Sequence, residues 1–376
     1  MAHVEIKPAM LDWVMHDADL SVSDVAILTR RSEPVVRSWL TGDARPNKGD
    51  LVSIARRAGR SLHFFMLPSP PGTSPVAVRF RTAIATSSAD PQLERTAIRG
   101  AQRNQKIARW AAEQNDAPVV TLPARSDTAE SYAAEIAKLL KWTKKDLHAA
   151  TSKTAVFRDL RARVEALGVV VLVTSTGAGN CRGFSLPDER APLIAINSDY
   201  IGPSVKSFTL MHELGHLSNS DTAICHDDDT VEEKWCNSFA ANFILPTSRV
   251  EDYFRLKRWS EVDEDDWHDQ IRLTSNYLRS SWRAVAIKLR DMGLSTQRVV
   301  DEVFASDTEF AKGTGFVDGS ERTRPKLRLD EFGSTFTRAV IDLRDTSRLS
   351  EIDARRFLGL NGSELRTLHG LLDGAA

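Results

Sequence analysis

The sequence predicts a mainly α-helical protein with a small β-sheet, an α+β fold. Apolar residues recur at helical spacing along most of the chain, and β-branched or alternating runs occur only near residues 169–173, 183–187 and 192–197. A length of 376 residues favours two or three domains. We expect four parts, which are a helical N-terminal domain (1–67), a linker (68–90), a central α+β domain (91–250) and a helical C-terminal region (251–376).

The composition is that of a folded protein, with 41% hydrophobic and 27% charged residues. A net charge of −1 does not by itself suggest a nucleic-acid-binding protein. No apolar run approaches the roughly 20 residues that a membrane span needs, and the N-terminus lacks the apolar core of a signal peptide. Three scattered cysteines (Cys181, Cys225 and Cys236) favour a reducing compartment. We therefore expect a cytoplasmic protein without a membrane partner.

Two short helices joined by a tight turn are predicted near the N-terminus. Ser21 and Asp24 form a capping box before the first helix, and residues 29–32 make the turn. The second helix runs through Val36 and Trp39 to a stop at Gly42. This order of helix, short turn and helix is typical of a helix-turn-helix that reads double-stranded DNA.

The buried side of the second helix determines which residues can face DNA. Val36 and Trp39 belong to the apolar stripe, so the residues between them face outward. The residues expected to contact DNA are Arg31, Glu33, Pro34, Arg37 and Ser38. Of the basic residues nearby, Arg30, Arg31, Arg45 and Lys48 could meet phosphates. Because acidic and basic residues nearly balance in this domain, a homodimer would be needed to gather enough phosphate contacts. The alternative is a helical domain that mediates only dimerisation or partner docking.

Residues 91–114 predict a long polar helix that carries several arginines between Arg95 and Arg109. Such a stripe is usually a solvated helix face, although it could add contacts to DNA or to a protein partner. Two further helices, at 127–141 and 155–167, precede the predicted strands.

His212-Glu213-Leu214-Gly215-His216 lies within a helix-length apolar pattern. Four residues are slightly more than one helical turn, so both imidazoles leave the same face and can bind one cation. Glu213 follows the first ligand, where it can accept a proton from a water molecule. The motif therefore predicts a zinc site with His212 and His216 as ligands and Glu213 as the catalytic base.

A catalytic zinc site needs a third protein ligand. The residues considered for this role are Glu232, Glu233, His226 and the acidic run 227–229. Glu233 is favoured because it lies on the next predicted helix, faces the same interior as Asn237, and would be held more firmly than a loop residue. Tyr200 and His226 are candidates for an oxyanion donor, but neither has a specific pattern behind it.

The assembled chain resembles regulators in which an Xre-type (Cro/C1-like) helix-turn-helix is joined to an ImmA/IrrE-family metallopeptidase domain. The segments that carry the resemblance are 36–46, 64–71, 80–82, 208–216, 233–246 and 349–360. The resemblance implies a zincin-like core at 91–250 and supports Glu233 over Glu232 as the third ligand. Two departures are Cys236, where the family usually has Ala, and the absence of a frequent His soon after the metal helix.

This resemblance implies a DNA-binding regulator whose zinc-dependent endopeptidase domain cleaves or controls a regulatory partner, either a repressor or a toxin-linked protein. Such proteins often act in stress responses or on mobile elements. The expected partners are double-stranded DNA of its own operator and a protein substrate or cognate toxin. The alternative is an antitoxin or transcriptional repressor whose metal domain mainly binds protein and turns nothing over.

Overall fold

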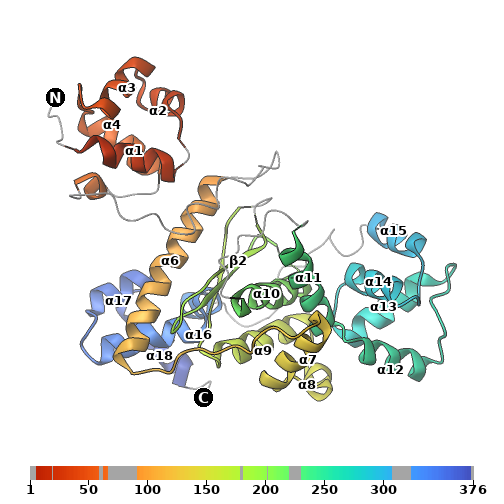
Figure 1. Ribbon diagram of the computed structural model, residues 1–376. Coiled ribbons are helices and arrows are strands. Elements are labelled where there is room, and N and C mark those ends of the chain that lie inside the picture. Colours follow the sequence, from red (N-terminus) through yellow and green to blue (C-terminus); the bar gives the residue numbers. More distant parts are fainter. Residues whose placement is uncertain are drawn as a thin grey trace. The chain divides into compact units, whose positions relative to one another are not determined.

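A computed structural model of the protein describes residues 6–18, 20–58, 62–66, 91–177, 181–200, 202–219, 230–306 and 323–373. It confirms the predicted fold class, because the chain is mainly helical and has a small three-stranded mixed sheet (Figure 1). The chain forms two compact units, Met1–Arg99 with Thr176–Asn180, and Gly100–Ser175 with Cys181–Ala376. The predicted linker at 68–90 lies outside the described residues, and the four predicted domain boundaries stay predictions.

The first unit is a bundle of short helices with locally encoded ends. Capping boxes start two of them, Ser21 with Asp24 and Asn47 with Asp50, and Gly42 ends another in a left-handed conformation with φ 88°. Its helices are α1 (Pro8–Asp17), α2 (Val22–Thr29), α3 (Glu33–Thr41), α4 (Lys48–Arg57), the 3-10 helix η1 (Leu62–Met66) and the first turns of α6 (Pro91–Gln114). Its apolar core includes Leu11, Val14, Val25, Val36, Trp39, Leu51, Ile54 and Phe65.

The sheet of the second unit has the strand order β1-β3-β2. The strands β1 (Val170–Thr174) and β3 (Leu193–Asn197) are parallel, and β2 (Gly183–Leu186) is antiparallel to β3. All three strands lie where the sequence predicts them, and the second and third pair as an antiparallel hairpin. Every residue of β2 and β3 is buried, including the polar residues Ser185 and Asn197.

Helices pack around this sheet and create the main core. The helix α10 (Pro203–Ser218) packs against β2, β3 and α9 (Lys153–Glu165), and α11 (Val231–Ile244) packs against α10 and α7 (Ala129–Leu139). A short helix, α8 (Lys144–Ala149), joins α7 to α9. The shared core contains Tyr132, Ile136, Leu160, Val171, Ile194, Met211, Leu214, Phe239 and Phe243. The α10 and α11 pairing is therefore held by buried side chains from several directions.

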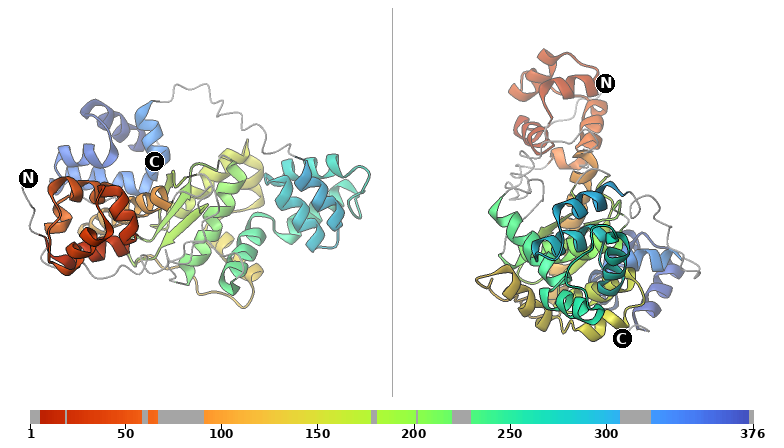
Figure 2. Two further views of the ribbon diagram at one scale, coloured as in Figure 1. Left: turned by 90° about the horizontal axis from the view of Figure 1, so that it is seen from above. Right: turned by 90° about the vertical axis from the view of Figure 1, so that its right-hand side faces the viewer.

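The C-terminal part of this unit forms two helical groups, which lie at opposite ends of the unit with the sheet between them (Figure 2). The first group, with its own core, is α12 (Thr247–Lys257), α13 (Trp267–Leu278), α14 (Trp282–Asp291) and α15 (Gln297–Ala305). The second is α16 (Arg324–Asp345), α17 (Glu351–Leu358) and α18 (Gly362–Asp373). No helix in the described part of the chain is both long enough and apolar enough to cross a membrane.

The helix α16 is kinked at Gly333, whose φ of 75° and ψ of 170° are not helical. The kink lies against β1 and the buried pair Arg161–Glu165 on α9. Glu165 accepts a hydrogen bond from the backbone N–H of Ser334 at 3.0 Å, so the N–H released by the kink has a partner. The C-terminal helices are thus joined to α9 through a specific polar contact.

Candidate metal centre

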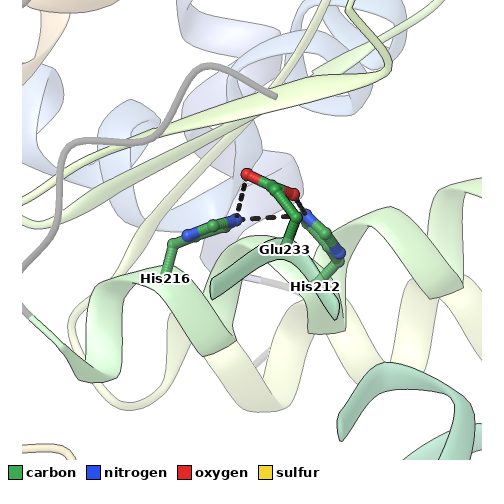
Figure 3. Close-up of side chains that lie close together, drawn as sticks. All are labelled: His212, His216 and Glu233. Carbon is green, nitrogen blue, oxygen red and sulfur yellow. Dashed lines mark hydrogen bonds and ion pairs between the residues drawn. The ribbon is translucent and has the colours of Figure 1, made fainter. Parts of the chain in front are cut away.

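The two histidines lie one turn apart on α10 and face the same side of it (Figure 3). Pro203 occupies the first turn of this helix, where its missing N–H is tolerated. The Nε2 atoms of His212 and His216 are 3.1 Å apart, and the residues are 7% and 0% exposed. The apolar stripe faces the core as expected, but the histidines are buried too, because α11 covers their side of the helix.

Glu233 reaches both imidazoles from the first turn of α11. Thr230 caps this helix, and its hydroxyl accepts a hydrogen bond from the backbone N–H of Glu233 at 3.2 Å. The carboxylate oxygens lie 3.1 Å from Nε2 of His212 and 3.3 Å from Nε2 of His216. Figure 3 shows the three polar ends converging on one point between the helices.

This buried His/His/Glu group could hold a metal ion. The contacts between the three groups measure 3.1, 3.1 and 3.3 Å. Ligands held tetrahedrally at about 2.0–2.2 Å from zinc would be separated by about 3.3–3.6 Å. Two imidazoles and one carboxylate are also a ligand set that catalytic zinc uses. The residues present therefore fit zinc in both spacing and chemistry.

Mutual interaction shifts the ionisation of two of these groups. Burial alone would raise the pKa of Glu233, but its bonds to His212 and His216 outweigh burial and lower that pKa to about 2. Burial likewise acts to lower the pKa of His212, and its bond to Glu233 raises it above the ordinary value. The carboxylate is therefore in the ionised form that a metal ligand requires.

Glu213, the predicted base, is 1% exposed and lies beside β2. A Cβ atom at Gly183 would come within 3.2 Å of Oε1 of Glu213 and within 2.5 Å of Thr209 Cγ2. Glycine at this strand position leaves space for the carboxylate of Glu213. The catalytic role of Glu213 stays a prediction.

The structure separates the candidates for the third ligand. Glu233 joins the two histidines, whereas Glu232 binds Arg125 through both carboxylate oxygens. His226 and residues 227–229 lie outside the described residues. Cys236 is buried with its sulfur 3.9 Å from Oε1 of Glu232, and burial raises the pKa of its thiol. His216, Glu232 and Cys236 form a second, adjoining group with metal-ligand spacing.

Sequence reasoning missed two residues that shape this centre, Arg125 and Gly183. Arg125 lies in an irregular segment between α6 and α7 and belongs to no motif, so the sequence carries no signal for it. Gly183 does carry a signal, because glycine inside a predicted strand often marks close approach of another group. Of the proposed oxyanion donors, Tyr200 lies with its ring 5.6 Å from the guanidinium of Arg182.

The predicted DNA-contacting residues are found at or next to α3, as expected from their spacing. Glu33, Pro34 and Arg37 are exposed, and Ser38 is half-buried. Val36 and Trp39 are in the core of the unit. Two of the predicted residues have ion-pair partners within the unit, since Arg31 pairs with Asp50 at 3.3 Å and Arg37 pairs with Glu33 at 3.4 Å.

Comparison with known families places the metal centre in a recognised domain. Residues 164–289 match a family model described as the IrrE N-terminal-like domain (Peptidase_M78). The matched segment begins at the end of α9, contains the sheet, His212, His216 and Glu233, and ends in α14. No curated protein and no solved structure gave a significant match to the chain.

Proposed function

We propose that this chain, in which residues 164–289 are an IrrE N-terminal-like domain, is a zinc-dependent endopeptidase that acts on a regulatory protein and carries a DNA-binding N-terminal unit. The observation that carries the proposal is the buried group of His212, His216 and Glu233 within a peptidase-family domain. Burial of two imidazoles around an ionised carboxylate is unfavourable without a compensating cation or proton. A bound zinc ion would supply that compensation.

The residues of the centre have two roles, metal binding and proton transfer. His212, His216 and Glu233 would hold the metal. When bound, zinc supplies Lewis acidity, which polarises a peptide carbonyl and makes a water molecule easier to deprotonate. Glu213 would accept a proton from the attacking water as its oxygen bonds to the peptide carbonyl carbon, and would deliver that proton to the amine nitrogen as the C–N bond breaks. The missing side chain at Gly183 leaves space for the Glu213 carboxylate, whose Oε1 a Cβ there would approach to 3.2 Å.

The N-terminal unit supports a regulatory role rather than general proteolysis. Its helices α2 and α3 pack together across the short connection of Arg30, Arg31 and Ser32, and α3 exposes polar residues. We infer that α3 binds the major groove of the protein's own operator as part of a homodimer in the cytoplasm, and that the peptidase substrate is a repressor or a toxin-linked partner.

A comparison of cells that carry either the wild-type chain or Glu213→Gln tests the proposal even while the substrate is unidentified. Mass spectrometry of protein N-termini should find new termini with the wild type and lose them with Glu213→Gln. The variant should still hold about one zinc per chain, because Glu213 is not among the three ligands. Ser53→Ala, a change in the N-terminal unit, is a matched control that should leave the termini as in the wild type.

Identical N-termini in both strains, with zinc bound in both, would overturn the proposed endopeptidase activity. This result would favour the alternative function, in which the metal domain binds a protein without cleaving it. In that function the metal domain holds a cognate toxin or repressor without cleaving it, and the chain acts as an antitoxin or transcriptional repressor. Retention of a partner by Glu213→Gln, with cleavage lost, is the result that the endopeptidase predicts.

A further inference from the structure

Arg125 contacts both helices of the metal centre from a segment outside the family-matched region. It lies between α6 and α7, and its side chain is 18% exposed. Its guanidinium lies over the ring of Trp235, with Cζ 3.9 Å from the ring centre. Burial acts to lower the pKa of Arg125, but the hydrogen bond to Glu232 and the charges nearby together outweigh burial and raise that pKa above its ordinary value. The guanidinium therefore stays a cation.

On one side Arg125 binds the C-terminal end of α10. Nη2 donates to the backbone oxygen of Gly215 at 2.8 Å, and Nε donates to the hydroxyl of Ser218 at 3.2 Å. Carbonyls in the last turn of a helix have no partner within the helix and carry its negative dipole, so they favour a cation. Gly215 directly precedes His216, and this bond therefore fixes the backbone that carries a ligand.

On the other side Arg125 binds the first turn of α11. Nη1 donates to Oε2 of Glu232 at 2.8 Å, and Nη2 donates to Oε1 of the same carboxylate. A paired arginine–carboxylate contact of this kind fixes orientation as well as distance. Glu232 directly precedes Glu233, so one planar group holds the residues adjacent to two of the three ligands.

The same contacts involve two members of the adjoining His216, Glu232 and Cys236 group. Oε1 of Glu232 lies 3.9 Å from Nδ1 of His216 and 3.9 Å from Sγ of Cys236, and Nη2 of Arg125 lies 3.6 Å from that sulfur. This group has the spacing of a metal site and contains a thiol, a ligand that zinc and cobalt bind well. With Arg125 in place, the Glu232 carboxylate is engaged, and the Cys236 sulfur has the Arg125 guanidinium as a hydrogen-bond partner.

We propose that Arg125 is a positioning residue of the metal centre. It fixes α10 against α11 and keeps Glu232 and Cys236 from binding the metal, so that the metal is held by His212, His216 and Glu233. This inference rests on the proposed metal binding and names the residue that selects between two adjoining ligand sets.

Cobalt(II) binding to the metal-free full-length chain tests the proposal, because a cobalt–thiolate bond absorbs in the near ultraviolet and cobalt bound only by His and Glu does not. The wild type should bind one cobalt ion without thiolate absorption. Arg125→Met should bind cobalt about 10- to 100-fold more weakly, the range typical for residues that orient metal ligands, and should gain the thiolate absorption. Adding Cys236→Ala to this variant should remove that absorption, and Arg125→Lys should restore part of the affinity.

Arg163→Met is the matched control. Arg163 is 24% exposed, donates to the backbone oxygens of Leu140 and Lys141, pairs with Asp146 and lies 5.5 Å from the ring of Trp142. Its loss should destabilise the fold to a similar degree, yet leave the cobalt spectrum and affinity as in the wild type.

Unchanged cobalt affinity and spectrum in Arg125→Met would overturn the positioning role while leaving the metal centre intact. Failure of the wild type to bind cobalt would instead overturn the proposed metal site. If Arg125→Met does not fold, Glu232→Gln decides the question, because it weakens the contact to Arg125 and preserves side-chain size. A several-fold loss of cobalt affinity in Glu232→Gln supports the proposal, and wild-type affinity overturns it.

Discussion

The two compact units of this chain acquire their defining features in different ways. In the N-terminal unit, the ends of the helices are fixed by residues three positions apart, such as Ser21 with Asp24 and Asn47 with Asp50. In the second unit, the candidate metal centre joins α10 to α11, and Arg125, which is distant in sequence from both helices, contacts each of them. Local signals are sufficient to predict helices. A chemical site also depends on contacts between segments that are distant in sequence, and no local pattern identifies those contacts.

The two units also differ in how closely their expected functions are linked to folding. The second unit presents a buried group of specific chemistry whose removal should change both metal binding and stability. The N-terminal unit presents exposed polar residues on α3, and their exposure means that function there should change with little effect on folding. The effect of a substitution on the stability of one unit can therefore be measured with the unfolding of the other unit as an internal reference.

Metal removal should have the largest effect. At a free metal concentration 100-fold above Kd, binding stabilises a protein by about 2.7 kcal/mol. Chelation should therefore lower the melting temperature of the metal-bearing unit and leave that of the N-terminal unit unchanged, as measured by calorimetry. Glu233→Gln should make the transition insensitive to added zinc. A parallel shift of both transitions would contradict the prediction that the metal stabilises only the unit that contains His212, His216 and Glu233.

Gly183→Ala should be the next largest change. The added methyl group would meet the Ala195 backbone oxygen at 2.9 Å as well as Thr209 and Glu213, and overpacking of this kind destabilises by about 1–3 kcal/mol. Urea unfolding measures this loss. Gly370→Ala, a change in α18 with open space around it, should instead be neutral or stabilising. Equal effects of the two substitutions would show that Gly183 does not provide space for Glu213.

Ser21→Ala should destabilise only the N-terminal unit, by about 1 kcal/mol, because it removes the cap of α2. The hydrogen bond from the Ser21 side chain lowers the pKa of Asp24 below its ordinary value of 3.8. A lowered carboxyl pKa contributes stability above pH 3.8 that is lost as the pH falls through the folded-state value. The wild type should show this acid-dependent loss in the N-terminal transition, and Ser21→Ala should show less of it.

Arg37→Ala should change stability least. Its ion pair with Glu33 is exposed, and such i,i+4 pairs contribute about 0.3–0.5 kcal/mol. If α3 binds DNA, the variant should nevertheless bind operator DNA more weakly, and loss of a phosphate contact should reduce the slope of log affinity against log salt by about 1. Titrations by fluorescence anisotropy at several salt concentrations measure both. Wild-type affinity and slope in Arg37→Ala would remove this residue from the proposed interface.

The sequence predicts the fold class, the three strands, the metal helix and the two histidine ligands because each depends on local periodicity or on fixed spacing. Helix position favours Glu233 over the loop candidates, and the family resemblance favours it over Glu232; the observed contacts agree, since Glu232 is engaged by Arg125. Arg125 could not be predicted, because an arginine in an irregular segment has no pattern that identifies its distant partners. The kink at Gly333 is not predicted for a similar reason, since the Arg161–Glu165 pair that lies against it is on another helix.

The most direct test of the central claim is the zinc content of the purified chain and of two isosteric variants, measured by mass spectrometry of the metal. Both glutamates are buried, and the carboxylate oxygens of Glu233 lie 3.1 and 3.3 Å from the Nε2 atoms of His212 and His216. The wild type and Glu213→Gln should each hold about one zinc per chain, and Glu233→Gln should hold almost none. Zinc retained in full by Glu233→Gln, or lost from Glu213→Gln, would contradict the assignment of the centre.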